Sequence, residues 1–172
     1  AAEEHERCVG TALRAMAALL EGVPVKAAAT QLEPLLEPHL PSLWPLGGAK
    51  APSVRAALFA LCLALLKAVP ELAERELGGL GGVLLDGLSE KDPICHAALW
   101  EPLLLLLRGH GERLRAATPS HKHILARLSS LLRHGCYGGA TSACHALLPL
   151  ASLLPDEQLV PAPAPAGAAA TA

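Results

Sequence analysis

The stretch PSVRAALF at residues 52–59 decides the fold, because the chain repeats it. Forty-one residues further on it returns as PICHAALW at residues 93–100. A proline, an Ala-Ala-Leu triplet and an aromatic residue occupy the same positions in both copies. Both copies continue into leucines and end on a base, Lys67 in the first and Arg108 in the second. A weaker copy, LRA at residues 13–15, lies 41 residues upstream of VRA at residues 54–56. A period near 41 residues is typical of helical repeats of the HEAT and armadillo kind.

The composition favours helices packed on helices. Of the 172 residues 52% are hydrophobic, yet only four are aromatic, so leucine, alanine and valine must build the core. Small alanines let helices approach closely, and the scarcity of β-branched residues disfavours a β-sheet. We therefore predict an all-α fold, a segment of a HEAT/armadillo-like helical-repeat solenoid (an α-α superhelix). The predicted core includes the paired positions Leu58, Phe59, Leu99 and Trp100.

Punctuation by proline and glycine divides the chain into units. We expect helical repeats over residues 1–154, in units of about 1–44, 52–88, 93–134 and 140–154, followed by a disordered or extended Pro/Ala-rich tail at residues 155–172. Pro34, Pro38 and Pro41 predict a kinked or two-piece second helix over residues 26–44, followed by a loop at residues 44–51. The apolar first and last helices lack the polar outer faces of capping repeats, which predicts a fragment of a longer solenoid.

Two glycine clusters predict interruptions. The run Gly78–Gly82 predicts a flexible connector, because each internal glycine costs a helix about 1 kcal/mol relative to alanine. Residues 109–111, Gly-His-Gly, are expected to end a helix that starts at Pro93 and bends at Pro102. In the polar connector at residues 89–92, Ser89 or Asp92 is a candidate cap for that helix.

Charge and hydropathy exclude several classes of protein. The net charge of −2 excludes a globally basic nucleic-acid binder, although a local basic patch is compatible with it. The first seven residues hold three glutamates, unlike a signal peptide, and no uncharged apolar run reaches the roughly 20 residues that a bilayer requires. Five scattered cysteines without a C-x-x-C pair indicate reduced thiols, and hence a cytosolic protein.

Enzyme and metal sites find little support in the residues. The closest Cys/His groups, at residues 121–123, 134–136 and 144–145, lack the paired spacing of zinc ligands, so we expect buried structural thiols and no metal. Cys62 and Cys95 lie in apolar helix patterns, where an inert thiol is the rule, and Cys95 and His96 are adjacent and face apart. Gly78–Gly82 lacks the strand and Gly-Lys-Ser/Thr of a phosphate-binding loop. No catalytic, cofactor-binding or metal residue is predicted.

The distribution of charge is more informative. Residues 71–101 carry seven acids and two bases, whereas the basic segment, residues 108–134, carries six bases, one acid and four histidines. Such a segment is either a solvated face or a phosphate-facing surface. The second reading makes the following residues candidate ribosome or phosphate contacts: Arg113, Arg115, Lys122, Arg127 and Arg133. For the paired bases Arg55 and His96 we favour a structural role, bonding a neighbouring carboxylate along the stack.

The second copy and its surroundings resemble a known family. The pattern SxxDPICxAALWE at residues 89–101 is similar to the N-terminal helical-repeat region of the listerin family. The first copy, PxVRxAxFxL at residues 52–61 after Trp44, resembles that region one repeat upstream, and LLP at 147–149 with LP at 154–155 continues the resemblance. The similarity covers roughly residues 5–155. This chain has Ala, Leu and Gly where the family is richer in aromatic residues, Lys and Glu, and the Pro/Ala tail has no counterpart.

The resemblance implies a large RING-type E3 ubiquitin ligase of ribosome-associated quality control. Such ligases are long helical solenoids that embrace the large ribosomal subunit, with the RING at the far C-terminus. By resemblance, the N-terminal region docks on the stalled 60S subunit beside a partner of the nuclear export mediator factor type. An E2 enzyme and zinc are expected only at the RING, outside these residues. The alternative is a generic HEAT-type adaptor for protein–protein interaction.

Overall fold

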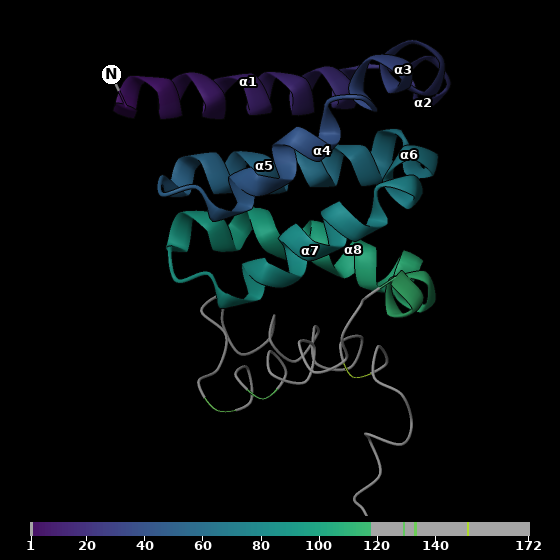
Figure 1. Cartoon of the computed structure of the whole chain (residues 1–172). Coiled ribbons are helices and arrows are strands. Elements are labelled where there is room, and N and C mark those ends of the chain that lie inside the picture. The colour runs from purple at the N-terminus through teal and green to yellow at the C-terminus, as the bar shows by residue number, and fades with distance from the viewer. Residues whose placement is uncertain (1, 118–128, 130–132, 134–150, 152–172) are drawn as a thin grey trace, which may run out of the picture.

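The structure, a computed structural model, describes residues 2–117 together with residues 129, 133 and 151, and the described residues form helices and no strand. Three long helices, α1 (Ala2–Gly22), α5 (Pro52–Ala68) and α8 (Pro93–Ala117), lie side by side with α5 in the middle (Figure 1). Shorter helices connect them and form a second row. The all-α helical-repeat segment predicted from the sequence is thereby confirmed. The shorter helices are α2 (Val25–Ala27), the π-helix η1 (Ala28–Leu32), α3 (Glu33–Leu36), α4 (Leu40–Leu43), the 3-10 helix η2 (Trp44–Gly48), α6 (Pro70–Arg75), α7 (Leu77–Asp86) and the 3-10 helix η3 (Gly87–Ser89).

The 41-residue period of the sequence is a period of burial. Both α5 and α8 begin at the proline of the repeated stretch, where the missing N–H costs no hydrogen bond. Positions that correspond in the two helices are buried together: Val54 with Cys95, Leu58 with Leu99, Cys62 with Leu103, and Leu65 with Leu106. In α1, Leu13 and Leu20 correspond to Val54 and Leu61 and are buried too. The weaker first copy therefore has the same register as the other two.

Helix α5 is buried on most of its circumference. Nine of its residues are buried, because α1 covers one side of the helix and α8 the other. Leu58 and Phe59 lie in this core, and Leu99 of α8 contributes to it. Trp100, which was expected in the same core, is only partly buried and packs against its edge. Equal register does not give equal burial here, because the described part of α8 packs mainly against α5 and α7.

The proline-rich segment after α1 is broken, as predicted. The chain from Val25 to Leu43 forms two α-helical turns and a π-helical stretch before Leu36, then a separate turn, α4, after residues 37–39. The prediction of a loop at residues 44–51 was wrong for its first five residues, because Trp44–Gly48 forms the 3-10 helix η2 with Pro45 in its first turn. A 3-10 turn tolerates proline at this position for the same reason as an α-helix does.

The glycine run Gly78–Gly82 is helical, and the prediction of a flexible connector was wrong. These residues lie inside α7, whose side chains Leu77, Leu80 and Val83 are buried. Two of the glycines are there for close packing. A Cβ atom on Gly79 would overlap the indole of Trp44, and one on Gly81 would overlap Leu114 of α8. The energy gained from this packing offsets the low helix propensity of glycine.

Helix α8 differs from prediction at two places. It continues through Pro102, where a bend was expected, and also beyond Gly109-His110-Gly111 to Ala117. The interruption at residues 109–111 is a kink: His110 has φ −131° and ψ 16°, outside the helical region. The predicted helices over residues 121–134 and 140–154 and the predicted tail lie outside the continuous described range.

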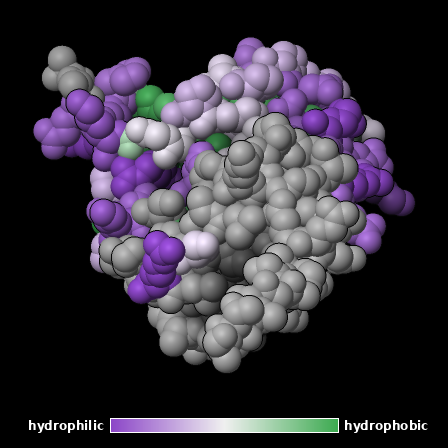
Figure 2. All heavy atoms as spheres, turned by 60° about the horizontal axis from the view of Figure 1, so that its bottom comes forward, coloured by the Kyte–Doolittle hydropathy of each residue, from purple (hydrophilic) through white to green (hydrophobic). Residues whose placement is uncertain are grey.

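The surface of the described helices is mainly polar. In the face shown in Figure 2, most of the described residues are hydrophilic, and hydrophobic ones appear in small separate areas. None of the described helices is long and apolar enough to cross a bilayer. Apolar side chains are thus concentrated between the helices, which is where the energy of this fold resides.

The glycines of α7 provide a matched test of this packing. We expect Gly79→Ala to lower the free energy of unfolding by about 1–3 kcal/mol, because the new methyl group displaces the Trp44 indole. Gly82→Ala should raise it by about 1 kcal/mol, because Gly82 is exposed, helical and has open space at its Cβ position. Urea denaturation of both variants measures the two effects. Equal effects would contradict the packing role of Gly79.

Candidate functional site

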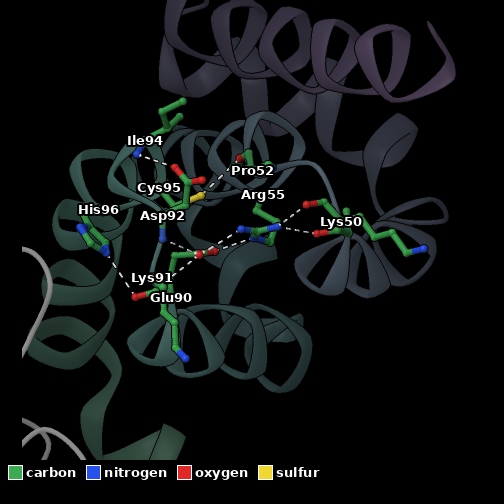
Figure 3. A network of polar contacts seen from close by, with 10 residues as sticks. Lys50, Pro52, Arg55, Glu90, Lys91, Asp92, Ile94, Cys95 and His96 are labelled. Atoms are coloured by element: carbon green, nitrogen blue, oxygen red, sulfur yellow. Dashed lines mark hydrogen bonds and ion pairs between the residues drawn. The ribbon is translucent and has the colours of Figure 1, made fainter. Parts of the chain in front are cut away.

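A polar network joins the start of α5 to the connector before α8 and to the first turn of α8 (Figure 3). We call it the junction clamp; its members are Arg55, Glu90, Asp92, Cys95 and His96. Arg55 comes from the first turn of α5, three residues after Pro52, and Glu90 lies three residues before Pro93 in the connector to α8. Arg55 therefore belongs to the first copy of the repeated stretch, and Glu90 lies just ahead of the second copy.

Arg55 uses its whole guanidinium group. Its Nε donates to Glu90 Oε2 at 2.5 Å and its Nη2 donates to Glu90 Oε1 at 3.0 Å. The remaining nitrogen, Nη1, donates to the backbone carbonyls of Ala49 at 2.6 Å and Lys50 at 2.9 Å. The two side chains are 16% and 10% exposed. A bidentate, largely buried pair of this geometry is much stronger than an ordinary surface ion pair.

The Glu90 carboxylate is held in its charged form. Hydrogen bonds from Arg55 lower its pKa to about 2, opposed by burial and helped by the backbone N–H groups of Lys91 and Asp92, which donate to Oε1 at 2.9 and 3.0 Å. The same pairing raises the pKa of Arg55. The Glu90 carboxylate thus orders the connector before α8 and links this connector to α5.

The other members of the junction clamp begin α8. Asp92 Oδ1 accepts the backbone N–H of Ile94 at 3.0 Å, the predicted capping interaction. His96 Nε2 lies 3.2 Å from the carbonyl oxygen of Glu90, and the Cys95 thiol donates to the Pro52 carbonyl at 3.3 Å. The structural role predicted for the paired bases is therefore confirmed for Arg55, whose partner is the Glu90 carboxylate.

Further ion pairs connect successive units. Lys67 of α5 pairs with Glu101 of α8 at 2.6 Å, and both side chains are at least half exposed. Arg75 of α6 bonds Glu37 at 3.0 Å and also pairs with Glu33 of α3. Sequence reasoning missed these pairs, since the partners lie 34 to 42 residues apart. That separation is close to the repeat period, which is the signal that could have found them.

The basic segment is described only in part. Arg113 is exposed and forms an ion pair with Glu74 of α6, so it is neutralised by a neighbour. Arg115 lies in α8, and Arg133 is an exposed helical residue. Lys122 and Arg127 lie outside the described residues. Of the five candidate contacts, Arg113 is the one for which a side-chain partner is described.

Of the three described cysteines, Cys62 and Cys95 are buried as predicted. Burial raises the pKa of Cys62 to about 12, and burial beside Glu90 raises the pKa of Cys95 to about 11, so neither thiol ionises readily. Cys8 is exposed on α1, which corrects the prediction of a buried thiol: it falls on the outer face of the helix, away from Leu13 and Leu20. Cys136 and Cys144 lie outside the described residues. Among the described residues, no three His, Cys, Asp or Glu side chains are grouped as metal ligands would be.

These features define the class of protein, which is an all-α helical-repeat segment. A family model described as "E3 ubiquitin-protein ligase listerin, N-terminal domain" matches residues 1–154. The chain belongs to the listerin family and corresponds to that N-terminal domain.

Curated relatives agree with this assignment. E3 ubiquitin-protein ligase listerin of Mus musculus is 31% identical over 113 residues, which is 66% of this chain and 6% of the relative. The Gallus gallus protein of the same name is 28% identical over 148 residues, 86% of this chain and 8% of the relative. The chain therefore spans only a small part of the length of these relatives. No solved structure matches it.

The junction clamp predicts a pH-dependent contribution to stability. The pKa of Glu90 falls from 4.5 to about 2 on folding, so its contribution is complete above pH 4.5 and is lost as the pH falls toward 2. We expect Glu90→Gln to lower the free energy of unfolding by about 2–3 kcal/mol at pH 7, and by progressively less between pH 4.5 and pH 3. Denaturant titrations across this range test the prediction. The exposed Glu71→Gln is the matched control, and a Glu90→Gln penalty that stays constant with pH would contradict it.

Thiol reactivity provides a second test of the core. In a Cys136→Ser/Cys144→Ser background, we expect one thiol per native chain to react rapidly with a disulfide reagent, and the other two only after unfolding. Adding Cys8→Ser should abolish the rapid phase. Two or three rapid thiols in the native protein would show that Cys62 or Cys95 is accessible.

Proposed function

We propose that this chain is a scaffold segment of a listerin-type E3 ubiquitin ligase that docks on stalled 60S ribosomal subunits. The observation that carries the proposal is family membership over residues 1–154, together with relatives named E3 ubiquitin-protein ligases. In the proposal a RING elsewhere in the protein, with its zinc ions and an E2 enzyme, ubiquitinates the nascent chain in the cytosol. A partner of the nuclear export mediator factor type binds the same 60S particle.

The described residues support a positioning role better than a chemical one. The buried thiols are protonated at neutral pH. In the junction clamp, the charges of Arg55 and Glu90 pair with each other. Salt bridges and apolar packing between successive units hold the helices at fixed relative positions. An array of packed helices held in this way keeps its parts at defined positions, which suits a ligase whose binding and catalysis occur at distant places.

The basic segment is the proposed docking surface for ribosomal RNA. Phosphate contacts are independent of sequence and suit arginine and lysine side chains on a helical surface. Arg113 would exchange Glu74 for a phosphate on binding, so its net contribution would be smaller than that of an unpaired base. The larger contributions are assigned to Arg115, Lys122, Arg127 and Arg133.

Co-sedimentation with purified 60S subunits tests the docking proposal. We expect the triple variant Arg113→Gln, Arg115→Gln and Lys122→Gln to bind more weakly, with the loss greatest at low salt. The magnitude of the slope of log affinity against log salt should fall by roughly 2–3 if all three bases contact phosphates. Glutamine is used because a glutamate at residue 113 would repel Glu74 and disturb the fold.

The matched control removes three exposed bases outside the basic segment, in the variant Arg7→Gln, Lys26→Gln and Lys50→Gln. It has the same net charge and should bind like the parent. If both variants sediment equally with 60S subunits at every salt concentration, the basic segment is a solvated face.

A generic adaptor for protein–protein interaction is the second candidate. Leu19 of α1, Val25 of α2 and Leu35 of α3 are 55%, 54% and 66% exposed, and large apolar side chains in such positions suit a protein partner. They lie in the last turn of α1 and in the two short helices, α2 and α3, that follow it. Figure 1 shows these elements at one end of α1. If the parent chain fails to sediment with 60S subunits at low salt, the adaptor function is favoured.

A further inference from the structure

Helix α8 consists of two parts that share α7 as a neighbour, since both Leu106 and Leu114 approach Gly81, and that otherwise pack against different helices. The part before Gly109 packs along α5, and Leu99, Leu103 and Leu106 are buried there. The part after Gly111 turns toward α6 and α7. Between them His110 is non-helical, with a glycine on each side. Paired glycines lower the cost of leaving helical geometry, so the two parts are joined by the weakest stretch of the helix.

The second part is held by contacts that it makes beyond the kink. Leu114 is 2% exposed and lies over Gly81 of α7, where the absence of a side chain leaves room for it. Glu74 of α6 contacts the kink and the part beyond it: one carboxylate oxygen pairs with Arg113, and the other lies 3.6 Å from His110 Nδ1. The direction of the second part is therefore set by α6 and α7.

The kink itself is loosely packed. A cavity of about 570 Å³ adjoins it, lined by Glu74 and residues 107–113. A Cβ atom on Gly109 would meet nothing within 4 Å. The Nδ1 atom of His110 is buried and has no hydrogen-bond partner among the described residues. At residues 109–111 the Glu74 carboxylate approaches His110 from α6, and the adjoining cavity leaves space in which the angle between the two parts can change.

We propose that residues 109–111 form a hinge, and that Leu114 on Gly81 together with Glu74 holds it in the bent position. Release of these contacts lets the second part of α8 swing away from α6 and α7 while the first part stays on α5. The hinge sets the direction of residues 112–117 relative to the first part of α8. It is a conformational device that is independent of what the segment binds.

Distances between spin labels test the hinge. In a Cys136→Ser/Cys144→Ser background, the native exposed Cys8 on α1 provides one label, and Glu112→Cys or Ala97→Cys provides the other. The first pair reports on the second part of α8 and the second pair on the first part. Cys62 and Cys95 are buried and stay unlabelled. Pulsed electron-spin resonance then gives both distance distributions in the full 172-residue chain.

Substitutions on α7 provide the perturbation and its control. Gly81→Ala displaces Leu114, whereas Gly82→Ala, one residue on, points into open space. With Gly81→Ala we expect the 8–112 distribution to shift and gain a second population, while the 8–97 distribution keeps its position and width. Gly82→Ala should change neither. Glu74→Gln should act in the same direction as Gly81→Ala, with Glu71→Gln as its control.

Two further outcomes decide the proposal. Adding Gly109→Ala and Gly111→Ala to Gly81→Ala should return a single, narrow 8–112 population, because alanine restores a stiff helix across the hinge. An unchanged 8–112 distribution in both Gly81→Ala and Glu74→Gln overturns the hinge, since the bend would then be fixed locally. Equal broadening of both distance pairs overturns it as well, because that result describes a general loosening of α8.

Discussion

The burial of α5 between α1 and α8 is the constraint on which the rest of the structure depends. A helix with neighbours on both sides must be apolar around most of its circumference, and α5 meets that requirement with alanine, leucine and one phenylalanine. Small alanine side chains such as Ala57 and Ala64 let the neighbouring helices approach, and leucines fill the space between them. The connecting helices then pack where the long ones leave room.

A core of this composition has no polar groups with which to fix the register of its helices. Leucine packs acceptably in several registers, whereas a bidentate ion pair is satisfied in only one. The junction clamp supplies this specificity just before α8, where Arg55 bonds Glu90. Arg55 also donates to a backbone carbonyl, and Glu90 also accepts from a backbone N–H group. The exposed pairs of Lys67 and Arg75 add less, because solvent screens them.

Family membership gives these physical features a context. In a long array, an error in the angle between two neighbouring units grows with distance from it, so strong clamps and defined hinges have consequences far from where they lie. The described residues contain both: a rigid connection between α5 and α8, and a glycine-flanked kink within α8.

The sequence by itself determined the helical class, the 41-residue period, the starts of α5 and α8 at Pro52 and Pro93, and the structural use of Arg55. Proline, hydrophobic spacing and a repeated base act locally or at a fixed interval, so one chain of letters is enough to read them. The family, too, could be recognised from the order of those motifs.

Only the tertiary structure decided the rest. Gly78–Gly82 is helical because Trp44 and Leu114, distant in sequence, occupy the space that Gly79 and Gly81 leave open. Trp100 is less buried than Phe59 although both occupy the same position in the repeat, since burial depends on which helices lie beside it. The partner of Arg113 is Glu74, 39 positions away, and no local pattern specifies it. Helix propensity and the repeat period can be read from one segment of the sequence. The space around a residue and the partner of a charged side chain depend on neighbouring helices, so they are determined only when the helices pack.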